Sequence, residues 1–226
     1  PILKLKKAMD GLSVGERIEV IATDAGFPRD AKAWCQSTGN TVLYSGEEKG
    51  YYKIVFEKRD LKDSYPSAGN IGNKSFILFS DDLDRAIATF VLANGAAATG
   101  KKVSIFFTFW GLNVIKKDHK PVVKKDFWGK MFSRMMPSNS KTLKLSRMSM
   151  LGMGGKIMRH LMHKKNIASL EELRQQAMDH GVEFIACQMT MEMMGICREE
   201  LLDGVTIGGV ATYMERAEKS NVNLFI

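Results

Sequence analysis

The chain has 226 residues, of which 45% are hydrophobic and 26% charged, and a formal net charge of +8 at pH 7. These values are those of an ordinary globular protein, and the length suits two small domains. No apolar run approaches the roughly 18 to 20 residues that span a bilayer, and no cationic leader precedes an apolar stretch. The sequence therefore shows neither an anchor nor a signal peptide, and we expect a cytoplasmic protein.

Residues 1–58 contain the pattern of a helix, a strand, a second helix and two strands. Apolar residues at helical spacing mark the first helix, and the β-branched segment Arg17–Ala22 follows as a strand. A second helix is expected over Arg29–Ser37, where Gly and Asn follow. The strands Thr41–Ser45 and Tyr51–Glu57 flank a hairpin turn. These elements predict a small two-layer α/β domain.

Residues 59–73 are rich in Pro, Ser, Gly and Asn, which predicts a linker. Over residues 74–226, apolar strands alternate with helices. This order predicts a mainly parallel five-stranded sheet with helices on both faces. The expected strands are Phe76–Phe79, Val103–Phe109, Val182–Ala186, Val205–Ile207 and Val222–Ile226.

Two local motifs of this second domain have a structural interpretation. Ser80 follows the first strand and predicts a helix N-cap, with Asp81 and Asp82 in the first turn, where the helix dipole favours acids. The segment Gly152–Gly155 does not follow a strand, so it fails as a dinucleotide-binding fingerprint. We interpret it as a hinge.

Cysteine usage leaves thiol chemistry open. An odd number of three cysteines argues against a disulfide scaffold, and no spacing suits a structural metal. Cys187 follows the strand Val182–Ala186 and precedes a predicted helix, at the strand end where open α/β folds bind ligands. Amides at a helix N-terminus favour a reactive thiolate. The alternative is a small buried hydrophobe, because free cysteines are often buried.

The other two cysteines have weaker signals. Cys197 lies ten residues after Cys187 and either resolves an oxidised Cys187 or packs in the core, which cysteine's preference for burial favours. Cys35 lies within a short helix, where packing or a neutral surface position explains it.

The positive charge belongs to one segment. From Lys116 to Lys165 there are 14 Lys/Arg against two acids, a balance of +12, whereas the remainder has 19 against 23, or −4. Residues 116–150 are interpreted as an insertion or lid. Its basic residues, mixed with Trp128 and Met131, suit nucleic acid, an anionic membrane, or a docking or oligomer surface. Alternatively, its apolar residues fold over the sheet; we favour docking or packing over nucleic acid.

The first domain resembles the TusA/SirA-type sulfur carriers. The resemblance rests on Gly15–Val20, Ala22–Phe27 and Ala33–Asn40. The functional cysteine of that family lies in a Cys-Pro-x-Pro motif, and Pro1 matches its second Pro. The motif cysteine and the first strand would then lie upstream, so we expect the chain to be a piece of a longer polypeptide.

Residues 74–226 resemble the DsrE/DsrF-like family, specifically its "peroxiredoxin-like" branch with a long insertion. Four blocks occur in order: Phe79–Ala86, Ala93–Ala98, Phe106–Asn113 and Ala186–Met191. The resemblance implies a parallel α/β domain, often oligomeric, with sulfur relay at Cys187. It also implies a site lined by Ser80, Asp81, Asp82, Trp110, Asn113 and Gln188.

Such pairs of domains also occur behind a rhodanese and a flavin-dependent coenzyme A-disulfide reductase-like module. FAD or NAD would bind only in such an upstream module, and no cofactor is expected in this chain. The expected partners are sulfur carrier, rhodanese or reductase domains and further copies of the chain.

The combined interpretation is a persulfide relay at a partly accessible Cys187, near the first amides of the next helix and the Ser80–Asp82 loop. As an enzyme the chain would be a sulfurtransferase or part of a disulfide oxidoreductase. The alternative is a non-catalytic module that oligomerises or docks a fused reductase through the basic insertion. A peroxide-reducing thiol enzyme is a third reading, but the Thr-x-x-Cys context of peroxiredoxins is absent.

Overall fold

The structure is a computed structural model, which describes residues 2–23, 27–59, 72–119, 121, 123, 131, 134–147 and 153–226. These residues form two compact units, one built mainly from residues before Gly72 and the other mainly from Gly72 onward. Of the expected linker, residues 60–71 lie outside the described residues. The first strand after it begins at Asn73, the last residue that the sequence assigned to the linker.

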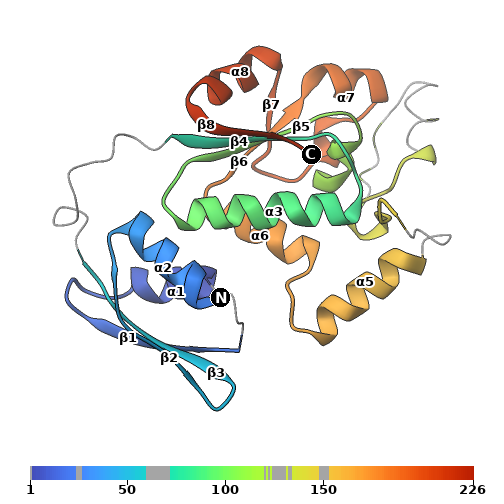
Figure 1. Cartoon of the computed structure of the whole chain (residues 1–226). Helices are drawn as coiled ribbons and strands as arrows, with labels where there is room; N and C mark the ends of the chain where they lie inside the picture. The colour runs from blue at the N-terminus through green and yellow to red at the C-terminus, as the bar shows by residue number, and fades with distance from the viewer. Residues whose placement is uncertain are drawn as a thin grey trace. The chain divides into compact units, whose positions relative to one another are not determined.

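The first unit is a three-stranded antiparallel sheet with two helices on one face (Figure 1). Its elements are α1 (Ile2–Asp10), β1 (Arg17–Ala22), α2 (Phe27–Thr38), β2 (Thr41–Glu48) and β3 (Tyr51–Glu57). The sheet order is β1-β3-β2, and apolar residues of both helices pack against Ile54 and Phe56 of β3. Lys49 and Gly50 turn the β2–β3 hairpin with φ of 46° and 84°, as a tight hairpin turn of the favoured twist requires.

The second unit is built on a five-stranded sheet of order β7-β6-β5-β4-β8, in which every strand pair is parallel. This confirms the expected fold class. Its elements are β4 (Asn73–Leu78), α3 (Leu83–Ala98), β5 (Val103–Phe107), the 3-10 helices η1 (Phe109–Ile115) and η2 (Ser140–Thr142), α5 (Met153–Lys164), α6 (Leu170–Asp179), β6 (Glu183–Cys187), α7 (Gln188–Met194), the 3-10 helix η4 (Arg198–Glu200), β7 (Thr206–Gly208), α8 (Val210–Glu218) and β8 (Ser220–Phe225).

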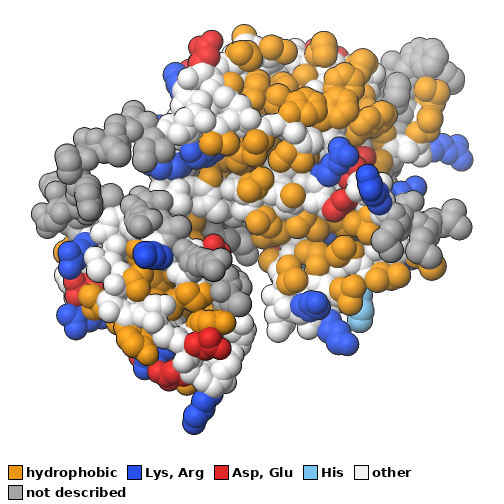
Figure 2. All heavy atoms as spheres, viewed as in Figure 1, with side chains coloured by type: hydrophobic (Ala, Val, Ile, Leu, Met, Phe, Trp, Pro, Cys, Tyr) orange, Lys and Arg blue, Asp and Glu red, His pale blue; other side chains and the backbone are white. Residues whose placement is uncertain are grey.

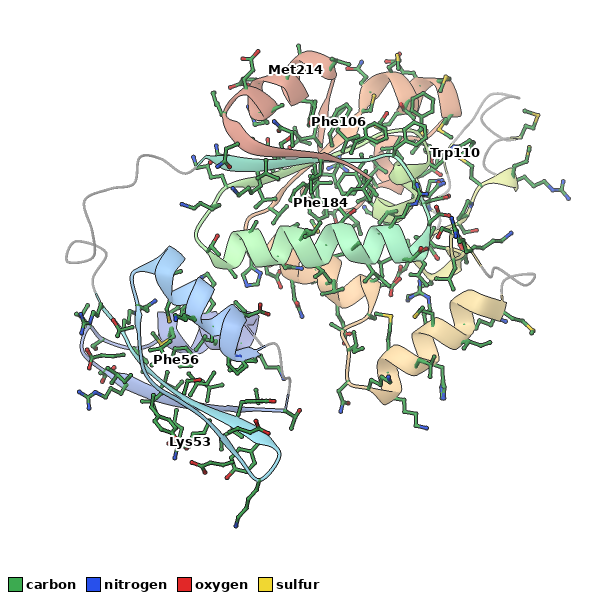
Figure 3. The ribbon with its side chains drawn as sticks, viewed as in Figure 1. Lys53, Phe56, Phe106, Trp110, Phe184 and Met214 are labelled. Carbon is green, nitrogen blue, oxygen red and sulfur yellow. The ribbon has the colours of Figure 1, made fainter. Side chains whose placement is uncertain are left out.

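The two faces of this sheet carry cores of different size (Figures 1 and 3). α3 and α6 cover one face, where Phe184 belongs to the large core. α8 covers the other face, where Phe106 and Tyr213 belong to a cluster of only four buried residues. Because strand side chains alternate between faces, β4, β5 and β6 each contribute to both cores. Tyr213 and the partly buried Ala217 are the residues that α8 adds to the smaller core.

Three local expectations are corrected. β5 ends at Phe107 rather than Phe109, because the chain turns into η1. α3 begins at Leu83, so Ser80 is not its N-cap. Gly154 and Gly155 lie buried in the first turn of α5 and form no hinge, whereas Gly152 lies outside the described residues. A side chain at Gly155 would approach the Leu143 carbonyl oxygen to 3.1 Å, so close packing explains this glycine.

The basic insertion, residues 116–150, is described only in part; residues 120, 122, 124–130, 132–133 and 148–150, with Trp128, lie outside the described residues. In the described part, Met136 and Leu143 are buried in the large core of the second unit. Part of the insertion thus packs on its own domain, as the alternative based on packing predicts.

Candidate functional site

Cys187 lies at the carboxyl edge of the parallel sheet. It is the last residue of β6 and directly precedes α7, and it is paired in register with Gly208 of β7. After Glu183, β6 is apolar and buried, which holds this strand end in place. α7 is short and ends at Gly195, whose φ of 61° is the left-handed conformation that glycine favours at a helix end.

The thiol of Cys187 is not accessible in this structure. Its side chain is 2% exposed and packs in the smaller core with Phe106, Ile185 and Tyr213. The rings of Phe106 and Tyr213 lie 5.3 Å apart between their centroids and close the cluster beneath α8. The expected partial accessibility is therefore wrong for this conformation, because strand alternation directs Cys187 towards the face that α8 covers.

The Ser80–Asp82 loop follows β4 at the same edge of the sheet. The Ser80 hydroxyl donates to Asp82 Oδ2 at 2.7 Å and accepts from the Asp82 backbone N–H at 3.0 Å. Asp81 accepts a hydrogen bond of 2.9 Å from Asn113 Nδ2. Burial raises the pKa of Asp81, and this exceeds the opposing effect of the Asn113 hydrogen bond; the charge of Asp82 adds to the rise.

The helix η1 brings Asn113 to Asp81 by turning back over the end of β4. Phe109 starts η1 with φ of 47°, a conformation that bulky residues rarely adopt, and such strain is often found at functional sites. The Gly111 backbone N–H then donates to the Phe79 carbonyl at 2.8 Å. A Cβ atom at Gly111 would lie 2.0 Å from the Leu78 carbonyl oxygen, so only glycine fits this contact.

A pocket of about 610 Å³ opens beside this loop. Its lining consists of Asp81, Asp82, Trp110, Met135, Met136, Pro137, Ser138, Thr142, Lys144 and Leu145. Trp110, at the end of the sheet in Figure 3, is 43% exposed. The structure therefore brings Asp81, Asp82, Trp110 and the supporting Asn113 together, but Cys187 is not part of this lining.

Asp81→Asn should stabilise the second unit at pH 7. The folded-state pKa of Asp81 is raised, so its ionised form costs stability above that pKa, and the cost is relieved as the pH falls through it. Asn keeps an oxygen for Asn113 and removes the charge. Because solvent screens this partly exposed carboxyl, we expect a gain of about 1 kcal/mol or less in urea unfolding, shrinking towards pH 4. A loss of stability at pH 7 would contradict this account.

The remaining predicted site residues lie apart from the pocket lining. Gln188 is exposed in the first turn of α7 and donates to Glu192 at 2.9 Å. Cys197 is partly buried just before η4, where its backbone N–H donates to Glu200 at 2.8 Å. Cys35 is buried in the first unit, and burial raises its pKa to about 11, so its thiol is protonated at neutral pH.

Sequence reasoning missed two threonines that connect the strand ends. The hydroxyls of Thr108, directly after β5, and Thr190, in α7, lie 3.0 Å apart and are buried. Thr190 also accepts from the backbone N–H of Phe109 at 3.4 Å. These bonds connect α7 to the start of η1. Both threonines lie inside stretches that resemble the DsrE/DsrF-like family, but nothing in the chain order pairs them.

Two further kinds of feature are absent from the described part of the chain. No group of three or more His, Cys, Asp or Glu side chains is placed to hold a metal ion there. None of the helices described is long and apolar enough to cross a membrane.

Comparisons with known proteins match the two units to two different families. Residues 72–225 match the DsrE/DsrF/DrsH-like family, and residues 1–58 match Sulfurtransferase TusA. The Bacillus subtilis protein YrkE is 45% identical over 152 residues, 67% of this chain and 95% of that protein. The sulfur carrier protein DsrE2 of Allochromatium vinosum is 37% identical over 155 residues, 67% of this chain and 96% of its own.

The first unit has its own relatives. The sulfur carrier protein TusA of Allochromatium vinosum is 40% identical over 58 residues, which are 26% of this chain and 76% of that protein. The chain thus belongs to the DsrE/DsrF/DrsH-like family and carries a TusA-like domain before its DsrE-like domain.

Proposed function

We propose that the chain transfers sulfur and carries it as a persulfide on Cys187. The Cys187 thiolate attacks the outer sulfur of a donor persulfide, R–S–SH, and forms a new S–S bond while the donor S–S bond breaks. The donor leaves as a thiolate and becomes the thiol R–SH by taking up the proton that the Cys187 thiol lost when it ionised. An acceptor thiolate then removes the outer sulfur in the same way, so no external oxidant or reductant is needed.

The observation that carries this proposal is the position of Cys187 at the carboxyl edge of β6, in a family whose relatives include a named sulfur carrier. The edge of a parallel sheet is the usual ligand-binding position of this architecture. The raised pKa of Cys35 makes it a poor nucleophile at neutral pH, which leaves Cys187 and Cys197 as candidates.

The burial of Cys187 sets a condition on the mechanism. With 2% exposure, its sulfur cannot meet a donor persulfide until the cluster that it shares with Tyr213 of α8 opens. α8 has nine residues and only Tyr213 is buried in it, so it is a candidate for local opening. We propose that the relay is gated by this movement.

Cys187→Ser should abolish sulfur loading. The full chain is incubated with glutathione persulfide and its intact mass is measured without reductant. We expect the wild type and the control Cys35→Ser to gain the mass of one sulfur atom, and Cys187→Ser to gain none, because its hydroxyl cannot form a persulfide. Undiminished loading of Cys187→Ser, with loss in Cys197→Ser, would transfer the role to Cys197.

A second candidate function is a non-catalytic docking module for a reductase of the same or another chain. The closed apolar cluster around Cys187 favours it, because free cysteines are commonly core residues. Under this reading no cysteine variant changes sulfur loading, so the same experiment separates the two candidates.

A further inference from the structure

The helix α5 has one side packed on its unit and one side exposed. Gly154, Gly155 and Met162 are buried on the packed side. Met153, Ile157 and Leu161 are 53%, 52% and 43% exposed. Their spacing of four residues places them in one stripe along the helix. This apolar stripe covers the length of α5 with no described neighbour to bury it.

A basic stripe runs beside the apolar one. Lys156, His160 and Lys164 have the same spacing of four residues, shifted by one position, and all three are exposed. Among the described residues, no ion pair joins Lys156 or Lys164 to an acid. Residues 127–170, which include α5, contain nine Lys/Arg and no Asp or Glu, and the first acid after them, Glu171, pairs with Arg159 instead. Figure 2 shows hydrophobic and basic side chains together over this helix.

The charge of Arg159, on the packed side of α5, is neutralised by a carboxylate of its own unit. Arg159 donates to Glu171 Oε2 at 2.9 Å and to the Ser140 carbonyl at 2.7 Å. Burial would raise the pKa of Glu171, but the Ser140 hydrogen bond and the Arg159 charge outweigh it, so the pKa lies below its usual range. The helix is therefore fixed to its unit by a paired charge, whereas the charges of its outer side are left for another partner.

We infer that α5 is an interfacial helix that binds the surface of an anionic lipid bilayer. Interfacial helices combine an apolar stripe with lysines, whose stems lie on the apolar surface while their ammonium groups reach lipid phosphates. A protein partner fits less well, because the cores of protein interfaces are depleted of lysine. Nucleic acid fits less well too, because the stripe is aliphatic and offers no ring for base stacking.

Vesicle sedimentation of the full chain tests this inference. We expect binding to vesicles of phosphatidylcholine with about one third phosphatidylserine, and weak binding to phosphatidylcholine alone, because anionic lipid attracts each lysine. The double variant Lys156→Glu/Lys164→Glu should bind at least roughly 30-fold more weakly. Ile157→Ser/Leu161→Ser should also lose binding, since it removes the inserted side chains.

A control variant changes the net charge by the same amount at two lysines outside α5. Lys4→Glu/Lys7→Glu alters two exposed lysines of α1 and should bind within about threefold of the wild type, because it leaves the apolar and basic stripes of α5 unchanged. Cys187→Ser should bind like the wild type, which separates this inference from the proposed sulfur transfer. Equal binding by the α5 double variants and the wild type would overturn the inference. So would equal binding to both vesicle types, or loss of an oligomer rather than of vesicle binding.

Discussion

Tyr213→Ala should increase the rate at which Cys187 reacts with iodoacetamide by roughly 100-fold. The Tyr213 ring packs against Phe106 in the buried cluster that contains Cys187, so we expect alkylation to require this cluster to open. Truncating a buried aromatic residue removes about 3 kcal/mol of packing, and this changes the population of the open state by roughly that factor. The rate is measured at neutral pH by mass spectrometry of the peptide that contains Cys187.

Two variants of α8 serve as controls for this prediction. Tyr213→Phe keeps the ring and should leave the rate within about threefold of wild type. Met214→Ala changes the next residue of α8, whose side chain is 46% exposed, and should also have a small effect. If Tyr213→Ala alkylates no faster than Tyr213→Phe, the thiol is reached by another route and the gating proposal is wrong.

Gly111→Ala should destabilise the second unit by about 4 kcal/mol or more. The added Cβ would lie 2.0 Å from the Leu78 carbonyl oxygen and 2.8 Å from its carbon, and backbone atoms of a central strand cannot move aside cheaply. Relief of the clash would break the bond from Gly111 to Phe79 and displace η1, including Asn113. Urea unfolding measures the loss, and hydrogen exchange of η1 shows whether the damage is local.

Gly95→Ala is the matched control for this substitution. Gly95 lies in α3, and a Cβ atom there meets nothing within 4 Å. Alanine should therefore stabilise the second unit by about 0.5–1 kcal/mol, because it restricts the unfolded chain and favours the helix. If both glycines tolerate alanine equally, the close approach at Gly111 is not a determinant of the fold.

Much of the architecture was determined by local sequence patterns. The alternation of short apolar strands with helices after residue 73 predicted the parallel five-stranded sheet, and all five strands lie within a few residues of their expected positions. The position of Cys187 at a strand end was also predicted, because a buried apolar strand followed by a helix is a local signal. The family resemblance could also be found from the sequence, because it depends on short motifs that occur in a fixed order along the chain.

Only the tertiary structure decided towards which face of the sheet the Cys187 side chain points and which helix packs over that face. Strand alternation places Cys187 and Ala186 on opposite faces of the sheet. The helix that packs over the face of Cys187 is α8, which begins more than twenty residues later in the chain. The start of η1 at Phe109 could not be predicted either, because the sequence of Phe106–Phe109 has the pattern of one continuous strand. The clash that requires Gly111, and the meeting of Asn113 with Asp81, arise from contacts between segments about 30 residues apart. Such contacts depend on packing in three dimensions, which periodicity along the chain does not encode.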